Sequence, residues 1–261
     1  MDTPESQHNQ PPGARAIFSA AGQDRLSFLQ GLLSNDVAGL TEDGIVYAAL
    51  LTPQGKYLAD MFVVGLGGAV YLDMDAQQAA ATVQRLNMYR LRADVQLAPA
   101  PIKVTCGVDA PPAGAMNDPR HSALGWRHYG AEMPQALIDW DALRVAHVIP
   151  QSGIELIPND SYILEAGLDR LNGVSFRKGC YVGQEVTARM RHKTELKKGL
   201  VRVRVTGSAP VGTPVMAGER AVGTLYTQSG GFGLAHLRLD WAQGPLQAGE
   251  ARLTLDKTAQ D

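Results

Sequence analysis

The 261-residue sequence has little cysteine, few aromatic residues and no long apolar run. Its two cysteines, Cys106 and Cys180, form no CxxC pair, which argues against a disulfide framework and fits a reducing compartment. The apolar run Met61–Leu72 is interrupted by glycines and is shorter than the about 20 residues that span a bilayer. Lys and Arg number 24 and Asp and Glu 26, for a net charge of −2, which disfavours a general nucleic-acid-coating protein.

The acidic, polar stretch 1–13 has neither the basic nor the apolar region of an export or mitochondrial signal. It predicts a disordered tail on a cytoplasmic protein. We expect a monomer with no membrane partner and no direct nucleic-acid partner. The remaining chain is rich in hydrophobic residues, 45% overall, and can therefore bury a sizeable core.

The first half of the chain mixes helix and strand patterns without βαβ alternation, which predicts an α+β fold. One helix is expected over Asp24–Leu33, capped by Asp24. A second helix begins at Asp75, with Gln78 completing a variant capping box. The spacing predicts strands over Ile45–Leu51, Tyr57–Leu66 and Ala69–Met74, with the last two joined by Gly67-Gly68, and further extended segments over Asp94–Ala98 and Ile102–Cys106.

The chain beyond a short helix at Trp140–Val148 ends in closely spaced strand patterns separated by glycine turns. Such spacing is typical of a small barrel or sandwich, and we place its boundary near residue 197. The strands expected are Leu200–Val205, Thr213–Ala217, Ala221–Thr227, Gly233–Arg238 and Ala251–Leu255.

Basic residues gather between Phe176 and Arg204, where only Glu185 and Glu195 oppose them. A concentrated positive patch in an acidic chain indicates a discrete anionic partner, although a solvated helix face would have the same composition. The basic residues are Arg177, Lys178, Arg189, Arg191, Lys193, Lys197, Lys198, Arg202 and Arg204.

Cys180 lies within this patch, in the string Lys178-Gly179-Cys180-Tyr181-Val182-Gly183-Gln184-Glu185. A helix is expected to begin near Gln184, so that the helix terminus and the neighbouring cations would lower the pKa of the thiol. Such a thiolate serves as a nucleophile, a redox thiol or a soft-metal ligand. The alternative is a buried cysteine that acts as a small hydrophobic residue.

This string resembles the signature of the YgfZ-type folate-binding proteins, relatives of the glycine-cleavage T-protein that include the mitochondrial iron–sulfur maturation factor. Shorter matches occur in the expected order over residues 14 to 240. They include Gly31–Asp36 (GLLSND), Thr52–Lys56 (TPQGK), Tyr89–Arg92 (YRLR), Asp118–Arg120 (DPR), Gly125–Arg127 (GWR), Leu164-Glu165 and Asn172–Phe176 (NGVSF).

The resemblance implies a three-part, ring-like T-protein fold: two interleaved α+β domains followed by a β-barrel. On this basis residues 14–47 and 118–196 would form the first domain, 48–117 the second and 197–261 the barrel. The resemblance also implies that tetrahydrofolate, or a derivative, binds at the domain junction.

Within that family, Glu165 matches the glutamate that accepts hydrogen bonds from the pterin edge; taken alone it would be a surface carboxylate. Lys178 and Arg189, with Arg92 as a weaker candidate, suit the carboxylates of the folate tail. The resemblance adds Asn35, Tyr181, Gln184 and Glu185 to the expected folate site.

The resemblance therefore implies a folate-binding factor that assembles or repairs iron–sulfur clusters through Cys180. A-type iron–sulfur carrier proteins and client iron–sulfur enzymes would be its partners. Cys180 would ligate a transient cluster shared with a partner, or act in redox or transfer chemistry. One cysteine cannot hold a cluster alone, so no resident metal is expected.

The main alternative is a folate-dependent aminomethyltransferase of the T-protein type. Its aspartate is expected in the helix 76–86, which here contains no acid and has Thr82 near that position. A cysteine hydrolase using His147 or His192 is a second alternative, without a supporting signature. RNA binding is a third, but the patch interleaves only Phe176 and Tyr181, so an effect on tRNA modification would be indirect.

Overall fold

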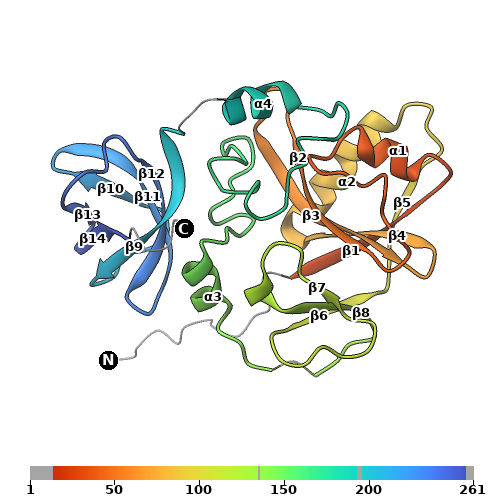
Figure 1. Ribbon diagram of the computed structural model, residues 1–261, viewed down its shortest axis with the longest axis horizontal. Helices are drawn as coiled ribbons and strands as arrows, with labels where there is room; N and C mark the ends of the chain where they lie inside the picture. Colours follow the sequence, from red (N-terminus) through yellow and green to blue (C-terminus); the bar gives the residue numbers. More distant parts are fainter. Residues whose placement is uncertain (1–13, 135, 193–195, 257–261) are drawn as a thin grey trace.

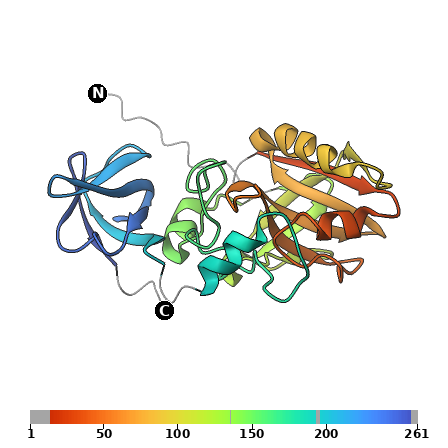
Figure 2. The ribbon, with the colours of Figure 1, turned by 90° about the horizontal axis from the view of Figure 1, so that it is seen from above.

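The computed structural model describes residues 14–134, 136–192 and 196–256, and its elements form three parts (Figure 1). A five-stranded sheet with two helices lies at one end, a closed β-barrel at the other, and a loop-rich region with α3 lies between them. Figure 2, seen from above, shows the same order. The expected disordered tail, residues 1–13, lies outside the described residues.

The five-stranded sheet has the order β2-β3-β4-β1-β5, and every neighbouring pair is antiparallel. Gly67 and Gly68 both adopt positive φ and turn β3 into β4, which confirms the predicted hairpin. The strands are β1 (Arg15–Ala21), β2 (Ile45–Leu51), β3 (Tyr57–Leu66), β4 (Ala69–Asp75) and β5 (Gln96–Pro99).

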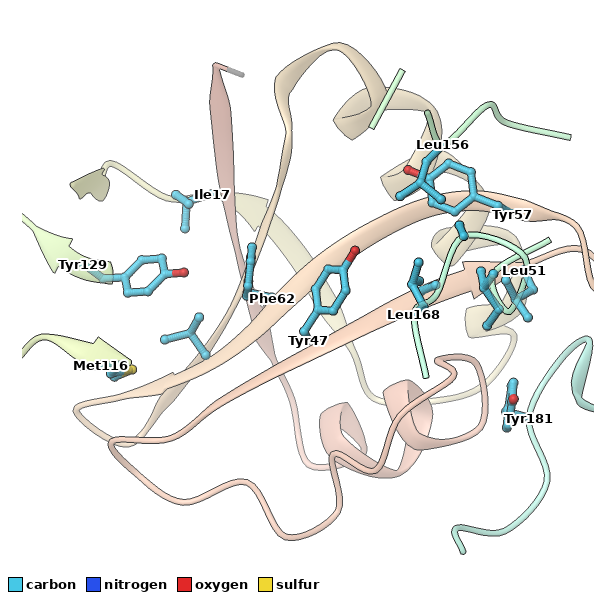
Figure 3. Close-up of a cluster of buried hydrophobic side chains, with 14 residues drawn as sticks. Ile17, Tyr47, Leu51, Tyr57, Phe62, Met116, Tyr129, Leu156, Leu168 and Tyr181 are labelled. Atoms are coloured by element: carbon cyan, nitrogen blue, oxygen red, sulfur yellow. The ribbon is translucent and has the colours of Figure 1, made fainter. Parts of the chain in front are cut away.

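Alternate residues of the central strands enter two different hydrophobic cores. Ala48 and Leu50 of β2 pack with the helices, whereas Tyr47 and Leu51 point to the opposite core. Figure 3 shows this second core, where Tyr181 of the cysteine-bearing loop joins the sheet residues. Because both sheet faces are covered, the strands read as nearly continuous apolar runs.

Two helices, α1 (Arg25–Gln30) and α2 (Ala76–Arg90), supply the first core. The first is shorter than predicted and Asp24 does not cap it, because its carboxylate accepts instead from the Asp94 backbone. Asp75 does cap α2 by accepting from the Gln77 backbone N–H. Gln78 does not complete the capping box, since its side-chain amide lies 3.0 Å from the Tyr57 hydroxyl.

A buried cluster of charges joins this sheet to a second, three-stranded sheet of order β6-β8-β7. Asp73 of β4 accepts hydrogen bonds from Arg15 at 2.7 Å, from Arg127 at 2.6 Å and from the Tyr129 hydroxyl at 2.8 Å. The Arg127 guanidinium lies 3.9 Å from the centre of the Phe62 ring. The second sheet comprises β6 (Lys103–Gly107), β7 (Met116–Asn117) and β8 (Trp126–Gly130), with the short 3₁₀ helix η1 (Ser122–Leu124) between the last two strands.

The barrel is closed and has the strand order β10-β11-β12-β9-β14-β13. Helix α3 (Trp140–His147) packs against it, and buried Arg144 donates to Glu155 and to Thr227 of the barrel. The sequence prediction missed the three-residue strand β13. The strands are β9 (Lys198–Thr206), β10 (Thr213–Ala217), β11 (Arg220–Ser229), β12 (Phe232–Arg238), β13 (Leu246–Ala248) and β14 (Ala251–Leu255).

The predicted α+β fold with a C-terminal barrel is confirmed. The expected domain boundary at 47/48 falls inside β2, whose residues on both sides pair continuously with β3 in one sheet. The first barrel strand, β9, begins at Lys198, directly after the expected boundary at 197. The chain preceding the barrel passes through residues 193–195, which lie outside the described residues.

Candidate functional site

Cys180 is exposed, in the loop that precedes helix α4 (Gln184–His192). The alternative of a buried, inert cysteine is therefore wrong for Cys180, whereas Cys106 on β6 is buried and burial raises its thiol pKa. Two side chains that flank Cys180, those of Lys178 and Tyr181, are buried.

The residues flanking Cys180 anchor its loop at two places. The Lys178 ammonium is buried and donates to the backbone oxygens of Gln30, Leu33 and Asn35 at 2.7, 2.7 and 2.9 Å. Tyr181 is buried in the core behind the sheet. Lys178 is thus not the free cation at a pocket mouth that the sequence suggested, because its donors are taken up by the protein itself.

The GLLSND segment forms a cradle for this loop. The Ser34 hydroxyl donates to the Gly173 backbone oxygen at 2.6 Å. The Ser175 N–H donates to the Ser34 backbone oxygen at 3.0 Å. Asn35, predicted to contact folate, donates instead to the backbone oxygens of Tyr47 and Asn172. Two motifs far apart in sequence thus form one structural unit around Cys180.

The TPQGK turn supports the other end of the loop. Gly183 has a φ of +84°, and a Cβ there would lie 2.6 Å from the Thr52 oxygen. Gly55, in the same turn, packs so closely on Val186 of α4 that a Cβ would lie 2.8 Å away. These contacts require glycine at both positions, which explains the TPQGK and CYVGQE patterns physically.

Several exposed cations belong to the Cys180 loop and to α4. Arg177 is exposed in the loop and Arg189 is exposed on α4. Arg191 stacks on the exposed ring of Phe176 at 4.9 Å and pairs with Asp169 at 3.1 Å. Glu185 opposes them in the first turn of α4. We call these exposed residues of the loop and of α4 the Cys180 face (Phe176, Arg177, Cys180, Arg189, Arg191 and His192). Its excess of cations favours an anionic partner.

Glu165 lies elsewhere, in a cleft of about 170 Å³ between the loop-rich region and the barrel. Its Oε2 is 3.1 Å from Nε2 of His236 on β12. Tyr162 and Tyr226 provide aromatic walls, and the full lining is Lys56, Glu155, Asp160, Ser161, Tyr162, Glu165, Ala166, Lys198, Leu200, Tyr226 and His236.

The comparisons with known proteins agree on the family. Residues 197–260 match the family model described as CAF17, C-terminal beta-barrel domain. The mitochondrial iron–sulfur cluster assembly factor IBA57 of Homo sapiens is 31% identical, over 89% of this chain and 78% of the relative. That of Mus musculus is 30% identical over the same shares.

This chain belongs to the IBA57 family. The glycine cleavage system aminomethyltransferase T from Bartonella henselae has the same fold, with a TM-score of 0.73 over 94% of this chain and 83% of that chain. Its sequence identity is 15%, so the likeness shows the fold alone. The predicted T-protein-like architecture is thereby confirmed.

The folate residues expected in this IBA57-family chain do not converge on one cleft. Glu165 lines the cleft beside the barrel, whereas Lys178, Tyr181, Gln184, Glu185 and Arg189 belong to the Cys180 loop and α4. Arg92 is exposed in the turn after α2 and lines neither place. Lys56 and Lys198 are the cations that line the Glu165 cleft, and the sequence analysis did not select Lys56.

Asp60 on β3 is a buried carboxylate that the sequence analysis missed. It accepts hydrogen bonds from the hydroxyls of Tyr47, Tyr57 and Ser152, and lines a narrow cavity of about 20 Å³. An acid within an otherwise apolar strand run was the signal that could have identified it. Thr82 is buried on α2 and donates to the Gln78 backbone oxygen.

Among the described residues, no hydrogen bond or ring contact joins either histidine suggested for a hydrolase to Cys180. His147 ends α3 and stacks on His121 at 4.3 Å, and burial, together with His121, lowers its pKa. His192 is exposed at the end of α4. No described group of three or more His, Cys, Asp and Glu side chains could hold a metal ion, and no described helix is long and apolar enough to cross a membrane.

Proposed function

We propose that this IBA57-family protein assembles or repairs iron–sulfur clusters by offering Cys180 as one thiolate ligand to a cluster carried by a partner. The exposed thiol, fixed between two buried anchors on a cationic face, is the observation that carries the proposal. The names of the human and mouse relatives support the same role.

The ligand exchange needs no oxidant. The Cys180 thiol releases its proton to solvent and forms an Fe–S bond, while one ligand of the partner's cluster leaves and takes up a proton. The partner must supply the remaining ligands, because Cys106 is buried on β6. A-type carrier proteins are the proposed donors, and apo iron–sulfur enzymes the recipients.

The cations of the Cys180 face predict that the partner presents an acidic surface to it. Opposite charges on the two proteins accelerate their encounter and orient them, and added salt screens this attraction. Replacing Arg177 and Arg189 with glutamine is expected to lower the association rate several-fold at low salt and to flatten its salt dependence. Arg220→Gln on β11 is the matched control.

We also propose that the Glu165 cleft takes the pterin of a reduced folate. The second carboxylate oxygen of Glu165 can accept from pterin N–H groups, while Tyr162 and Tyr226 flank the ring. Lys56 and Lys198 line the same cleft and are the cations proposed to meet the carboxylates of the glutamate tail. A cleft of about 170 Å³ encloses only part of such a ligand, so the tail remains outside.

Aminomethyl transfer finds less support in this structure. Helix α2, where its aspartate was expected, contains no acidic residue, and Thr82 there donates to the Gln78 backbone oxygen. The buried carboxylate of Asp60 is a poor substitute, because it already accepts from three hydroxyl groups and its cavity of about 20 Å³ has room for little more than a water molecule. The cytoplasmic location and an indirect effect on tRNA modification remain predictions.

The test is cluster transfer from a loaded A-type carrier to an apo client enzyme, followed by recovery of client activity. Wild-type protein is expected to accelerate recovery, Cys180→Ser to abolish the acceleration, and Cys106→Ala to preserve it. Equal acceleration by wild type and Cys180→Ser would refute the proposal.

A further inference from the structure

Lys178 is the link between the Cys180 loop and a distant part of the chain. Its side chain lies two positions before the thiol, and the residue is 7% exposed. The ammonium has three N–H donors, and the three backbone oxygens of Gln30, Leu33 and Asn35 lie within 2.9 Å of it. Every donor is therefore used, and all three acceptors belong to the end of α1 and the turn that follows.

A second anchor follows the thiol directly. Tyr181 is buried in the core behind the sheet, and the Lys178 ammonium lies 5.1 Å from the centre of its ring. Only Gly179 and Cys180 are exposed between these anchors. Without the Lys178 side-chain contacts, the loop just before Cys180 would keep the Ser175 N–H bond to the Ser34 backbone oxygen. It would also keep the longer local bonds that the Arg177 and Lys178 N–H groups donate to the Ser175 hydroxyl.

We propose that Lys178 is a positioning residue that holds Cys180 in one place on the Cys180 face by binding the carbonyl groups at the end of α1. A ligand that is already ordered loses less conformational entropy when it binds, so a fixed thiol captures an incoming cluster more readily. The chemical purpose of this positioning rests on the proposed function, but the positioning itself can be measured without it.

The contacts distinguish this role from recognition of a ligand's carboxylate. A cation that met a folate tail or an acidic partner would need an N–H group directed to solvent. The side chain of Lys178 is directed inward and is fully coordinated by backbone oxygens. Arg177, one position earlier, is the exposed cation of this pair.

The experiment places a nitroxide label on Cys180 in a Cys106→Ala background and records its mobility by electron paramagnetic resonance. Lys178→Met keeps the aliphatic stem and removes the donors, and is expected to shorten the label's correlation time at least threefold. Arg202→Met is the matched control, because it removes a half-buried cation that binds Asp256 and the Ala146 backbone oxygen, at the barrel. Lys178→Arg is expected to restore part of the restriction.

A label equally restricted in Lys178→Met and in its parent would overturn the proposal. So would an equal loosening in Arg202→Met, because the effect would then reflect general destabilisation.

Lys178→Gln provides a second measurement if Lys178→Met does not fold. Its side-chain amide has two N–H donors where the ammonium has three, so it cannot bind all three backbone oxygens of Gln30, Leu33 and Asn35. The label should be more mobile in Lys178→Gln than in its parent, and a label equally restricted in both would contradict the proposal.

Cluster transfer by the unlabelled variants separates this inference from the proposed function. If Lys178→Met loosens the label but wild-type protein transfers no cluster, the positioning is correct and the proposed function fails. If wild-type protein transfers clusters and Lys178→Met leaves the label restricted, the proposed function stands and the positioning role is refuted.

Discussion

The side-chain amide of Asn35 donates a hydrogen bond of 2.7 Å to the backbone oxygen of Asn172, across 137 positions of sequence. The same amide donates to the Tyr47 oxygen at 2.9 Å. Together with Ser34 and Lys178, this residue joins the turn after α1 to the segment that presents Cys180. A site with one reactive side chain therefore depends on a second, chemically inert motif.

Asn35→Ala should lower the free energy of unfolding by about 1–3 kcal/mol, because two backbone oxygens lose their donor. Urea unfolding followed by circular dichroism measures this change, with Gln54→Ala in an exposed turn as the control. Folate affinity should not change, because Asn35 does not line the Glu165 cleft. A large loss of folate affinity in Asn35→Ala, with unchanged stability, would show that Asn35 contributes to folate binding.

Gly183→Ala should destabilise the protein by more than about 1 kcal/mol, since φ is +84° and the new Cβ meets the Thr52 oxygen at 2.6 Å. Gly179→Ala, in the same loop, is the control: its φ is not positive and no atom lies within 4 Å of the added carbon. Thermal unfolding should separate the two variants clearly. Equal melting temperatures would show that the loop is less tightly held than described.

Stability should fall steeply in acid because of Asp73. Burial alone would raise the pKa of this carboxyl, but the Arg15 and Arg127 guanidiniums outweigh it and hold the pKa below the ordinary 3.8. Its contribution is therefore complete above that ordinary value and is lost as the pH falls through the lower folded pKa.

Urea unfolding between pH 7 and pH 2 measures this effect. Asp73→Asn should cost about 3–5 kcal/mol at pH 7, since two guanidiniums lose a buried partner. The difference between wild type and variant should shrink below pH 4. A difference that is constant with pH would show that the carboxylate charge does not matter.

Glu165→Ala should remove most of the affinity for tetrahydrofolate. Calorimetry is expected to give micromolar binding to wild-type protein, about −8 kcal/mol, and little or none to the variant. Glu185→Ala on α4 is the matched control, because it removes a carboxylate of the same length outside the cleft. Wild-type protein that binds no folate at millimolar concentration would refute the folate proposal.

Much of the fold follows from local patterns in the sequence. The Gly67-Gly68 turn, β2, β3 and most barrel strands were predictable because strand periodicity and glycine turns coincide there. Helix α1 was predicted too long because its leucines continue to Leu33, whereas the structure ends the helix at Gln30. The three-residue β13 is too short for any periodicity.

The sequence was enough to select Cys180, but not to predict how the residues around it are arranged. Composition identified a basic segment, yet it could not show that Lys178 turns inward while Arg177 stays in solvent. That difference is decided by carbonyl groups some 145 positions away, which no local pattern reveals. The separation of Glu165 from α4 likewise depends on the docking of the barrel.

The most direct test of the account is native mass spectrometry of this protein mixed with a [2Fe–2S]-loaded A-type carrier. Wild-type protein and Cys106→Ala should each form a complex that retains one cluster, with a visible absorption spectrum changed from that of the carrier alone. Cys180→Ser should leave the cluster on the carrier with an unchanged spectrum. A cluster-bearing complex formed equally well by Cys180→Ser would contradict the claim that this thiol is a cluster ligand.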